Sequence, residues 1–234
     1  MRQIFLDTET TGLNAAGGDA IVEIGCIEMV NRRLTGNTRH YYLNPQRSSH
    51  PDALRVHGLS DEFLADKPLF AEVVDELMAF LAGAEIIMHN AAFDVGFLDE
   101  ELHRCARAPM AEVVAQVSDS LLMARELYPG KSNSLDALCR RLEVDNSNRT
   151  LHGALLDAGL LAEVYIGMTR GQGSLVIDDD DASTGAIGHE SIDLSSFILP
   201  VLVATVDEIT AHRALLADID IACKGRLVWR GDLA

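Results

Sequence analysis

The sequence predicts an α/β domain, with a mixed five-stranded sheet flanked by helices and a flexible C-terminal tail. Short apolar, partly β-branched runs typical of strands recur in the first half of the chain and alternate with amphipathic runs at helical spacing. The composition then changes at Gly171, beyond which Asp, Gly, Ser and Thr are frequent.

The first three predicted strands follow one another closely, so we expect an antiparallel meander. Residues 4–7 are apolar up to a final acid and contain neither Gly nor Pro, which favours a strand. Residues 20–30 are apolar on both faces, as in a central strand, and Gly25 within them indicates close packing against a neighbour. Residues 39–45 form the third candidate and end at a proline.

The elements that follow alternate between helix and strand. Residues 46–66 are polar, and we interpret them as a long surface loop that carries His57. The fourth strand is reached through a helix and should lie parallel to the first. The predicted elements after the loop are a helix at 69–82, a strand at 85–90, a helix at 91–106, a strand at 116–119, short helices at 120–128 and 134–142, and a long helix at 153–169.

Three segments divide the chain. Residues 1–170 form the α/β domain, and residues 171–190, with four Asp in a row, form a flexible acidic linker. Residues 191–234 hold a strand-like run at 197–206 and a helix-like run at 206–220. About 40 residues rarely build an independent core, so we expect this segment to dock on a partner, with Trp229 as an anchor.

Composition narrows the class of protein. The chain has 234 residues, of which 48% are hydrophobic, and a formal net charge of −17 at pH 7. It has no bilayer-length apolar run and no secretory signal, and its four cysteines are scattered, so we expect a cytoplasmic protein without a membrane partner. Proteins that hold DNA unaided are normally basic. If the substrate is nucleic acid, metal ions and a partner must supply the attraction.

Two acids at the end of the first strand are the first sign of chemistry. Strand side chains alternate between faces, so Asp7 and Glu9 point the same way, about 7 Å apart. Like charges at a strand end repel each other, and a divalent cation between them relieves that repulsion. The alternative is that both acids are simply solvated, which is the usual case for an isolated pair of this kind.

Asp94 and Asp157 each fall in the first turn of a predicted helix, on its core-facing side. A single acid at such a position usually stabilises the start of the helix, where free N–H groups and the helix dipole favour its charge. Two of them together with Asp7 and Glu9 would give four carboxylates at one cleft, which suits two Mg²⁺ or Mn²⁺ ions. Two such ions about 4 Å apart can promote phosphodiester cleavage by water.

His152 precedes Asp157 by five residues, a step of about 500° that would put them on different faces of one helix. We therefore expect His152 just before the helix begins, at the rim of the site, where an imidazole can accept a proton from water. The alternative is a solvated histidine at a helix entry. Asp119, on the last predicted strand, is more simply a structural residue.

At this point the sequence resembles a known family. The segments FLDTETTG at 5–12, HNAAFD at 89–94 and HGALLDA at 152–158 resemble, in order and spacing, the three motifs of the DEDDh 3′–5′ exonucleases. VHGL at 56–59, FAEV at 70–73, NSLDALC at 133–139 and TLHG at 150–153 resemble its members that proofread for bacterial replicative DNA polymerases. The resemblance is dense over residues 2–170 and thin over 200–229, and it implies a ribonuclease H-like fold.

The resemblance also implies a role for each motif residue. Asp7, Glu9 and Asp157 would hold one divalent cation, and Asp7 would bridge to a second that Asp94 supports. His152 would be the general base that takes the proton of the attacking water. The residues implied to bind the terminal nucleotide are Thr10, Thr11, Gly12, Leu13, Asp52 and His57.

The implied activity is hydrolysis of the 3′-terminal phosphodiester of DNA, with selectivity for frayed, mismatched ends. The implied partners are the polymerase alpha subunit, bound by the tail, and a small accessory subunit. Gln172 and Leu175 resemble a short peptide that binds the sliding clamp. Two alternatives stay open: a related enzyme acting on RNA 3′ ends, and a replisome scaffold whose catalysis is secondary.

Overall fold

The computed structural model describes residues 1–147, 151–170 and 204–223. These residues belong to two units, the first holding those up to residue 170 and the second those from residue 204, and each unit is described by itself. Within the described ranges, no helix combines the length and the apolar character needed to cross a membrane.

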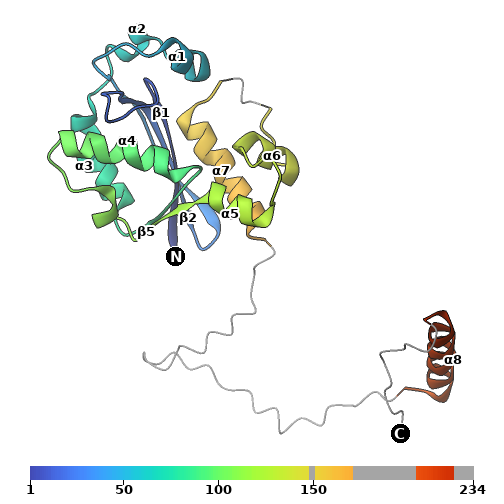
Figure 1. The fold of residues 1–234 in the computed structure, drawn as a ribbon. Coiled ribbons are helices and arrows are strands. Elements are labelled where there is room, and N and C mark those ends of the chain that lie inside the picture. Colours follow the sequence, from blue (N-terminus) through green and yellow to red (C-terminus); the bar gives the residue numbers. More distant parts are fainter. Residues whose placement is uncertain (148–150, 171–203, 224–234) are drawn as a thin grey trace, which may run out of the picture. The chain divides into compact units, whose positions relative to one another are not determined.

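The first unit is built on a five-stranded sheet with the strand order β3-β2-β1-β4-β5 (Figure 1). The strands are β1 (Arg2–Thr10), β2 (Ile21–Val30), β3 (Arg33–Tyr42), β4 (Glu85–Met88) and β5 (Gln116–Asp119). β2 is antiparallel to both β1 and β3, whereas β4 is parallel to both β1 and β5. The predicted α/β fold with a mixed five-stranded sheet is confirmed.

Helices cover both faces of this sheet (Figure 1). The α3 and α4 helices pack on one face, and α5, α6 and α7 pack on the other. The α1 and α2 helices lie beyond the end of β1 (Figure 1). The helices of this unit are α1 (Pro51–His57), α2 (Asp61–Leu64), α3 (Phe70–Leu81), α4 (Ala91–Arg104), the 3₁₀ turn η1 (Met110–Glu112), α5 (Ser120–Leu127), α6 (Leu135–Leu142) and α7 (Ala154–Met168).

Alternation along β1 decides which side chains meet which helices. Ile4 and Leu6 pack in the apolar cluster formed with α3 and α4, whereas Phe5 packs in the cluster formed with α7. Because strand side chains alternate between faces, Asp7 and Glu9 lie on the same side as Phe5. The two acids therefore face α7.

Gly25 allows α7 to approach the sheet beside these acids. It pairs with Asp7 across the β1–β2 ladder, and a Cβ atom at this position would collide with the backbone of Ala154 and Leu155 in the first turn of α7. The missing side chain therefore lets the start of the helix lie directly against β2. The close packing predicted at Gly25 is confirmed.

Two predicted elements differ from the structure. β3 begins at Arg33 rather than at residue 39, because it is an edge strand of mostly exposed side chains and lacks the apolar pattern that marks a strand. The predicted loop at 46–66 contains α1 and α2. With seven residues, α1 is too short for helical periodicity, although Pro51 at its start and Gly58 at its end, with a φ of 72°, are boundary signals.

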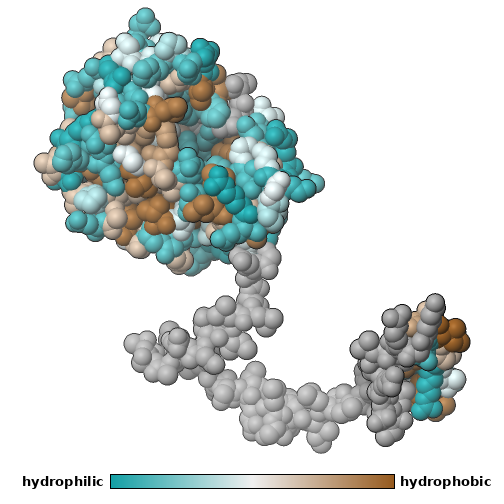
Figure 2. Space-filling model, viewed as in Figure 1, coloured by the Kyte–Doolittle hydropathy of each residue, from teal (hydrophilic) through white to brown (hydrophobic). Residues whose placement is uncertain are grey.

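The second unit contributes one described helix, α8 (Val206–Ala222), which begins with a capping box between Thr205 and Glu208. No residue of α8 is buried, and Leu215 and Ile221 are more than half exposed. The helix-like run predicted at 206–220 is confirmed, and most of the strand-like run before it lies outside the described residues. Hydrophilic residues cover much of the visible face of the first unit, with hydrophobic patches between them (Figure 2).

Candidate functional site

A pocket of about 270 Å³ lies at the end of β1. Five of its lining residues are the ones for which the sequence suggested metal binding or catalysis, namely Asp7, Glu9, Asp94, His152 and Asp157. They come from one strand and from the starts of two helices that pack on opposite faces of the sheet. Three segments that are far apart in the sequence therefore meet at this pocket.

Asp94 enters the pocket where β1 extends past β4. The parallel pairing of the two strands ends at Phe5 and Ile87, and further along β1 the first turn of α4 takes the place of β4. Thr8 donates both its hydroxyl, at 2.7 Å, and its backbone N–H, at 3.1 Å, to Asp94 Oδ1. Burial raises the pKa of Asp94 to about 7, although the hydrogen bonds from Thr8 act in the opposite direction. A cation beside this carboxylate would offset the cost of burying its charge.

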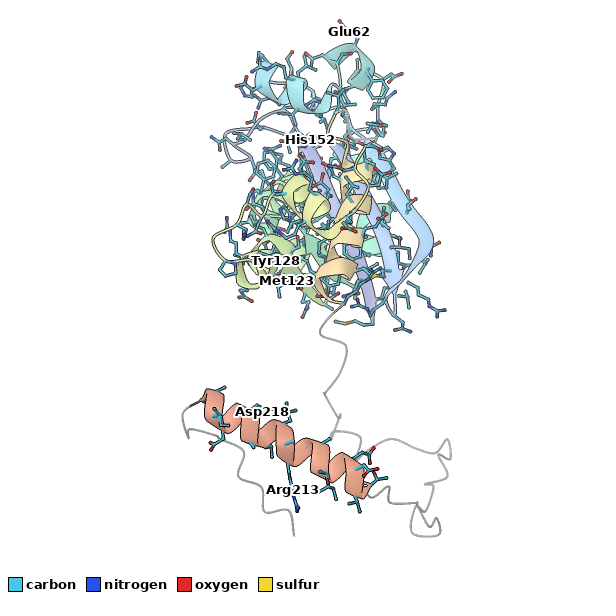
Figure 3. The ribbon with its side chains drawn as sticks, turned by 90° about the vertical axis from the view of Figure 1, so that its right-hand side faces the viewer. Glu62, Met123, Tyr128, His152, Arg213 and Asp218 are labelled. Carbon is cyan, nitrogen blue, oxygen red and sulfur yellow. The ribbon has the colours of Figure 1, made fainter. Side chains whose placement is uncertain are left out.

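His152 and Asp157 flank the start of α7. The helix begins at Ala154 with Gly153 as its N-cap, so His152 precedes it, as expected, and the buried Asp157 stands in its first turn. His152 Nδ1 lies 3.5 Å from Asp157 Oδ2, and the His152 side chain is 46% exposed. The backbone N–H of His152 donates to the carbonyl of Val56 in α1, at 3.0 Å. The backbone of His152 is thus anchored to α1, whereas its imidazole stays partly exposed to solvent. Figure 3 labels its position.

The residues at this pocket could hold a divalent cation. One potential ligand atom each from Glu9, His152 and Asp157 lies within 4.8 Å of the other two. Asp7 and Asp94 line the same pocket and add two carboxylates. Carboxylate oxygens are the donors that hard divalent cations prefer, so the donor set fits such an ion.

Asp119 supports the start of α4 from the neighbouring strand. Its carboxylate accepts the backbone N–H groups of Asn90 and Ala91, each at 3.1 Å, and that of Leu121 at 2.8 Å. Asn90, the N-cap of α4, has a φ of 72° and no capping side chain, so Asp119 supplies the missing acceptor. One carboxylate therefore orders the starts of both α4 and α5.

Some residues that line this pocket were not recognised as site residues from the sequence. Thr8 and Asp136 both line it. Asp136 stands in the first turn of α6, whose N-cap is Ser134. An acid in the first turn of a helix is the same signal that singles out Asp94 and Asp157, and it could have indicated Asp136 as well.

A second pocket of about 630 Å³ adjoins the first, and both are lined by Thr8, Glu9 and Phe93. Five of the residues implied to bind a terminal nucleotide line it, namely Thr10, Gly12, Leu13, Asp52 and His57. Thr11 is fully buried and lies outside this lining. The two pockets therefore share part of their lining, and the larger one lies beside the carboxylates of the first.

Among the residues that α1 contributes to this pocket, the two ionisable side chains, His57 and Asp52, differ in character. His57 is buried, and its Nδ1 accepts the N–H of Leu59 at 3.0 Å, so its proton belongs on Nε2. That nitrogen makes no hydrogen bond of ordinary geometry among the described residues, and burial lowers the pKa of His57, although the backbone of Thr10 acts in the opposite direction. Asp52 is 87% exposed at its side chain and pairs with Arg55. His57 therefore offers a donor from a buried ring, and Asp52 offers an exposed charge to the same pocket.

The chain matches the exonuclease family model (RNase_T) over residues 4–165. It is 52% identical over 237 residues to DNA polymerase III subunit epsilon of Escherichia coli (strain K12), a match that covers 98% of this chain and 97% of the relative. The chain belongs to this exonuclease family, among the epsilon subunits. The epsilon subunit of Pasteurella multocida is 48% identical over 100% of this chain and 95% of the relative.

Solved structures agree on the exonuclease fold. Exonuclease X in complex with 5′ overhanging duplex DNA superposes with a TM-score of 0.57 at 24% identity, over 74% of this chain and 93% of that one. The ribonuclease H-like fold implied by the sequence motifs is thereby confirmed. The match to the exonuclease family model and to the epsilon subunits shows that the chain is an exonuclease. Gln172, Leu175 and Trp229 lie outside the described residues.

Proposed function

We propose that the chain is the proofreading subunit of a replicative DNA polymerase and hydrolyses the 3′-terminal phosphodiester of DNA. The observation that carries the proposal is the meeting of four carboxylates and one histidine at a single pocket of an exonuclease fold. The neighbouring larger pocket is the space we assign to the terminal nucleotide.

Asp7, Glu9, Asp94 and Asp157 are the residues that would hold two divalent cations, Mg²⁺ or Mn²⁺. Such ions, when bound, favour attack by water and stabilise charge on the leaving oxygen. Oxygen ligands suit them better than an imidazole nitrogen does, so we assign the carboxylates to metal binding and keep His152 for proton transfer. Burial of Asp94 and Asp157, each 3% exposed, keeps these carboxylates from being fully hydrated and thereby favours a cation as partner.

His152 accepts the proton of the attacking water. Its exposure leaves room for water, and the Asp157 carboxylate lies 3.5 Å from Nδ1 of the imidazole. A new P–O bond forms to the water oxygen, and the bond between phosphorus and the 3′ oxygen of the penultimate nucleotide breaks. The departing 3′ oxygen takes a proton from solvent. The products are a 5′-mononucleotide and a strand shortened by one, with a new 3′ hydroxyl.

The terminal nucleotide enters the larger pocket, where Thr10, Gly12 and Leu13 form one wall. Leu13 is 87% exposed, so its side chain is available for an apolar contact with a base. His57 donates through Nε2, and Asp52 approaches from the mouth. Both pockets together accept an unpaired end, which favours mismatched over matched termini because a mismatched end frays more readily.

The acidic chain acts on DNA through its partners and ions. We propose the domain division 1–170, 171–190 and 191–234, in which the last segment binds the polymerase alpha subunit and α8 presents exposed apolar side chains for that contact. Tethering then replaces intrinsic DNA affinity by effective concentration. Trp229 serves as an anchor, Gln172 and Leu175 contact the sliding clamp, and a small accessory subunit completes the assembly in the cytoplasm.

The catalytic assignment is tested by digestion of a 3′-labelled oligonucleotide with and without Mg²⁺. We expect Asp7→Asn combined with Glu9→Gln to abolish Mg²⁺-dependent release of mononucleotides and to leave the fold intact by circular dichroism. Asp75→Ala is the matched control, because Asp75 is 76% exposed on α3 and pairs only with Arg107 among the ion pairs of the described residues. Wild-type activity in the double variant would refute the assignment, and faster digestion of a matched RNA strand would favour the RNA alternative.

The division into segments is tested by truncation after Arg170. We expect the truncated chain to keep its nuclease activity and to lose co-purification with the polymerase alpha subunit. The reverse outcome, lost activity with retained binding, would contradict the proposed division.

A further inference from the structure

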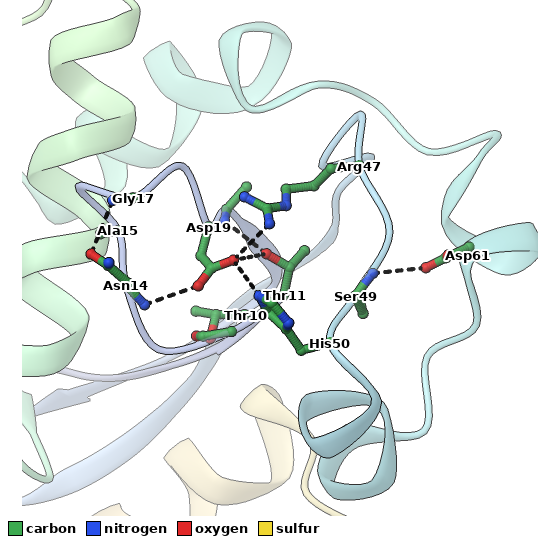
Figure 4. Close-up of polar contacts among 12 residues, drawn as sticks. Thr10, Thr11, Asn14, Ala15, Gly17, Asp19, Arg47, Ser49, His50 and Asp61 are labelled. Atoms are coloured by element: carbon green, nitrogen blue, oxygen red, sulfur yellow. Dashed lines mark hydrogen bonds and ion pairs between the residues drawn. The ribbon is translucent and has the colours of Figure 1, made fainter.

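Asp19, a buried residue outside the acidic pocket, makes polar contacts with two segments that line the larger pocket (Figure 4). Asp19 precedes β2 and is only 5% exposed. Its Oδ2 accepts the backbone N–H of Asn14 at 3.0 Å, and its Oδ1 accepts the hydroxyl of Thr11 at 3.2 Å. The same Oδ1 lies 3.1 Å from Arg47 Nη2 and 3.3 Å from His50 Nε2. Four groups therefore converge on one side chain.

These partners belong to two different segments. Thr11 and Asn14 flank the turn that follows β1, which supplies Gly12 and Leu13 to the pocket wall. Arg47 and His50 precede α1, which supplies Asp52 and His57 to the same lining. The backbone N–H of His50 also donates to the carbonyl of Thr11, at 2.8 Å. Asp19 and this backbone hydrogen bond therefore hold the two segments together.

The packing around Gly12 shows how closely these segments meet. A Cβ atom at Gly12 would collide with the Asp19 carboxylate on one side and with the His50 ring on the other. Burial raises the pKa of Asp19, but the bonds from Asn14, Thr11 and Arg47 outweigh it and hold that pKa below its usual value. The Asp19 carboxylate is therefore ionised at neutral pH, and both of its oxygens can accept hydrogen bonds.

We propose that Asp19 is a positioning residue for the terminal nucleotide. It lines the larger pocket itself and holds both the turn that presents Leu13 and the segment that presents His50, and it lies outside the lining of the acidic pocket. The proposal rests on the proposed function and adds to it the residue that sets the width of the nucleotide pocket. Nucleotide binding, rather than the chemical step, is what depends on Asp19.

The test uses the full chain with Asp19→Ala, Asp19→Asn and the surface control Asp75→Ala. KM and kcat are measured on a single-stranded oligonucleotide, and the Kd of deoxythymidine 5′-monophosphate, a product of the reaction, is measured by calorimetry in Mn²⁺. We expect Asp19→Ala to raise both KM and this Kd about tenfold, since it removes a charged, buried hydrogen-bond acceptor, and to leave kcat within about threefold. Asp19→Asn, which keeps acceptor oxygen for Asn14 or Thr11 but loses the charge, should fall in between.

Two results would overturn the proposal. An unchanged KM and an unchanged mononucleotide Kd, with or without a lower melting temperature, would reduce Asp19 to a purely structural residue. A fall in kcat with unchanged KM would place its effect on the chemical step. If Asp19→Ala does not fold, Asp19→Asn alone decides through the same two constants. A wild-type chain that binds the mononucleotide but releases none from DNA would instead count against the proposed function.

Discussion

Substitution of Gly25 by alanine tests whether the approach of α7 to the sheet sets the catalytic geometry. A Cβ atom at this position would lie 2.2 Å from the backbone nitrogen of Leu155, whereas ordinary contacts begin near 3.4 Å. The obstacle is helix backbone, which cannot rotate away as a side chain can. The start of α7 must therefore move outward by about 1.2 Å.

That displacement carries two functional residues with it. Asp157 stands in the first turn of α7 and His152 lies just ahead of it, while Asp7 sits directly opposite Gly25 on β1. A shift of about 1 Å in a catalytic group can lower the rate by about 100-fold. Overpacking of this kind costs about 1–3 kcal/mol of stability, which leaves most chains folded. We therefore expect a large loss of kcat in a folded protein.

The assay is single-turnover digestion of a labelled oligonucleotide in saturating Mg²⁺, with thermal unfolding measured on the same samples. Gly96→Ala is the matched control. Gly96 is exposed within α4, and a Cβ atom there meets no atom within 4 Å apart from the neighbouring helix backbone, so alanine should stabilise the helix by about 0.5–1 kcal/mol and leave kcat unchanged. Wild-type kcat in a folded Gly25→Ala variant would refute the reasoning, as would a loss of rate that only follows the unfolded fraction.

Asp119→Ala removes the acceptor for backbone N–H groups at the starts of α4 and α5. It should lower the free energy of unfolding in urea by about 1–2 kcal/mol, and Asp119→Asn should lower it by less. Equal stability of the alanine variant and the wild type would contradict this prediction. Acid should also destabilise the fold through Glu28, whose pKa is lowered from 4.5 to about 2 by hydrogen bonds from Asn37, Arg2 and Thr35. Because the folded state favours the ionised form, this stabilisation is complete above pH 4.5 and is lost as the pH falls towards 2. The loss is on the order of 1–2 kcal/mol, and Glu28→Gln should flatten it in urea titrations at pH 6 and pH 3; parallel losses in both proteins would count against it.

The sequence contained enough to predict most of the sheet and the acids at its end. Asp7 and Glu9 follow an apolar strand with the spacing that puts both on one face, and Asp94 and Asp157 stand in the first turns of two helices that the sequence predicted. Each of these signals lies within one strand or helix, so it can be recognised without knowledge of how the elements pack. Gly25 within an apolar strand likewise indicated close packing, although the sequence did not show that α7 is the neighbour.

Other parts of the site depend on contacts that no local pattern records. The acceptor role of Asp119 towards Asn90 requires β4 and β5 to lie side by side, and the convergence on Asp19 requires the segment before α1 to fold back on the turn after β1. The α1 helix itself is too short to show a period. Such features are set by tertiary packing, so a sequence read by itself leaves them undefined.

The most direct test of the central claim is anomalous diffraction from crystals of the chain grown with Mn²⁺ and deoxythymidine 5′-monophosphate. If carboxylates from β1, α4 and α7 bind paired cations, two manganese peaks about 4 Å apart will lie within ligand distance of Asp7, Glu9 and Asp157. A pocket without manganese, or peaks confined to other parts of the surface, would contradict the account.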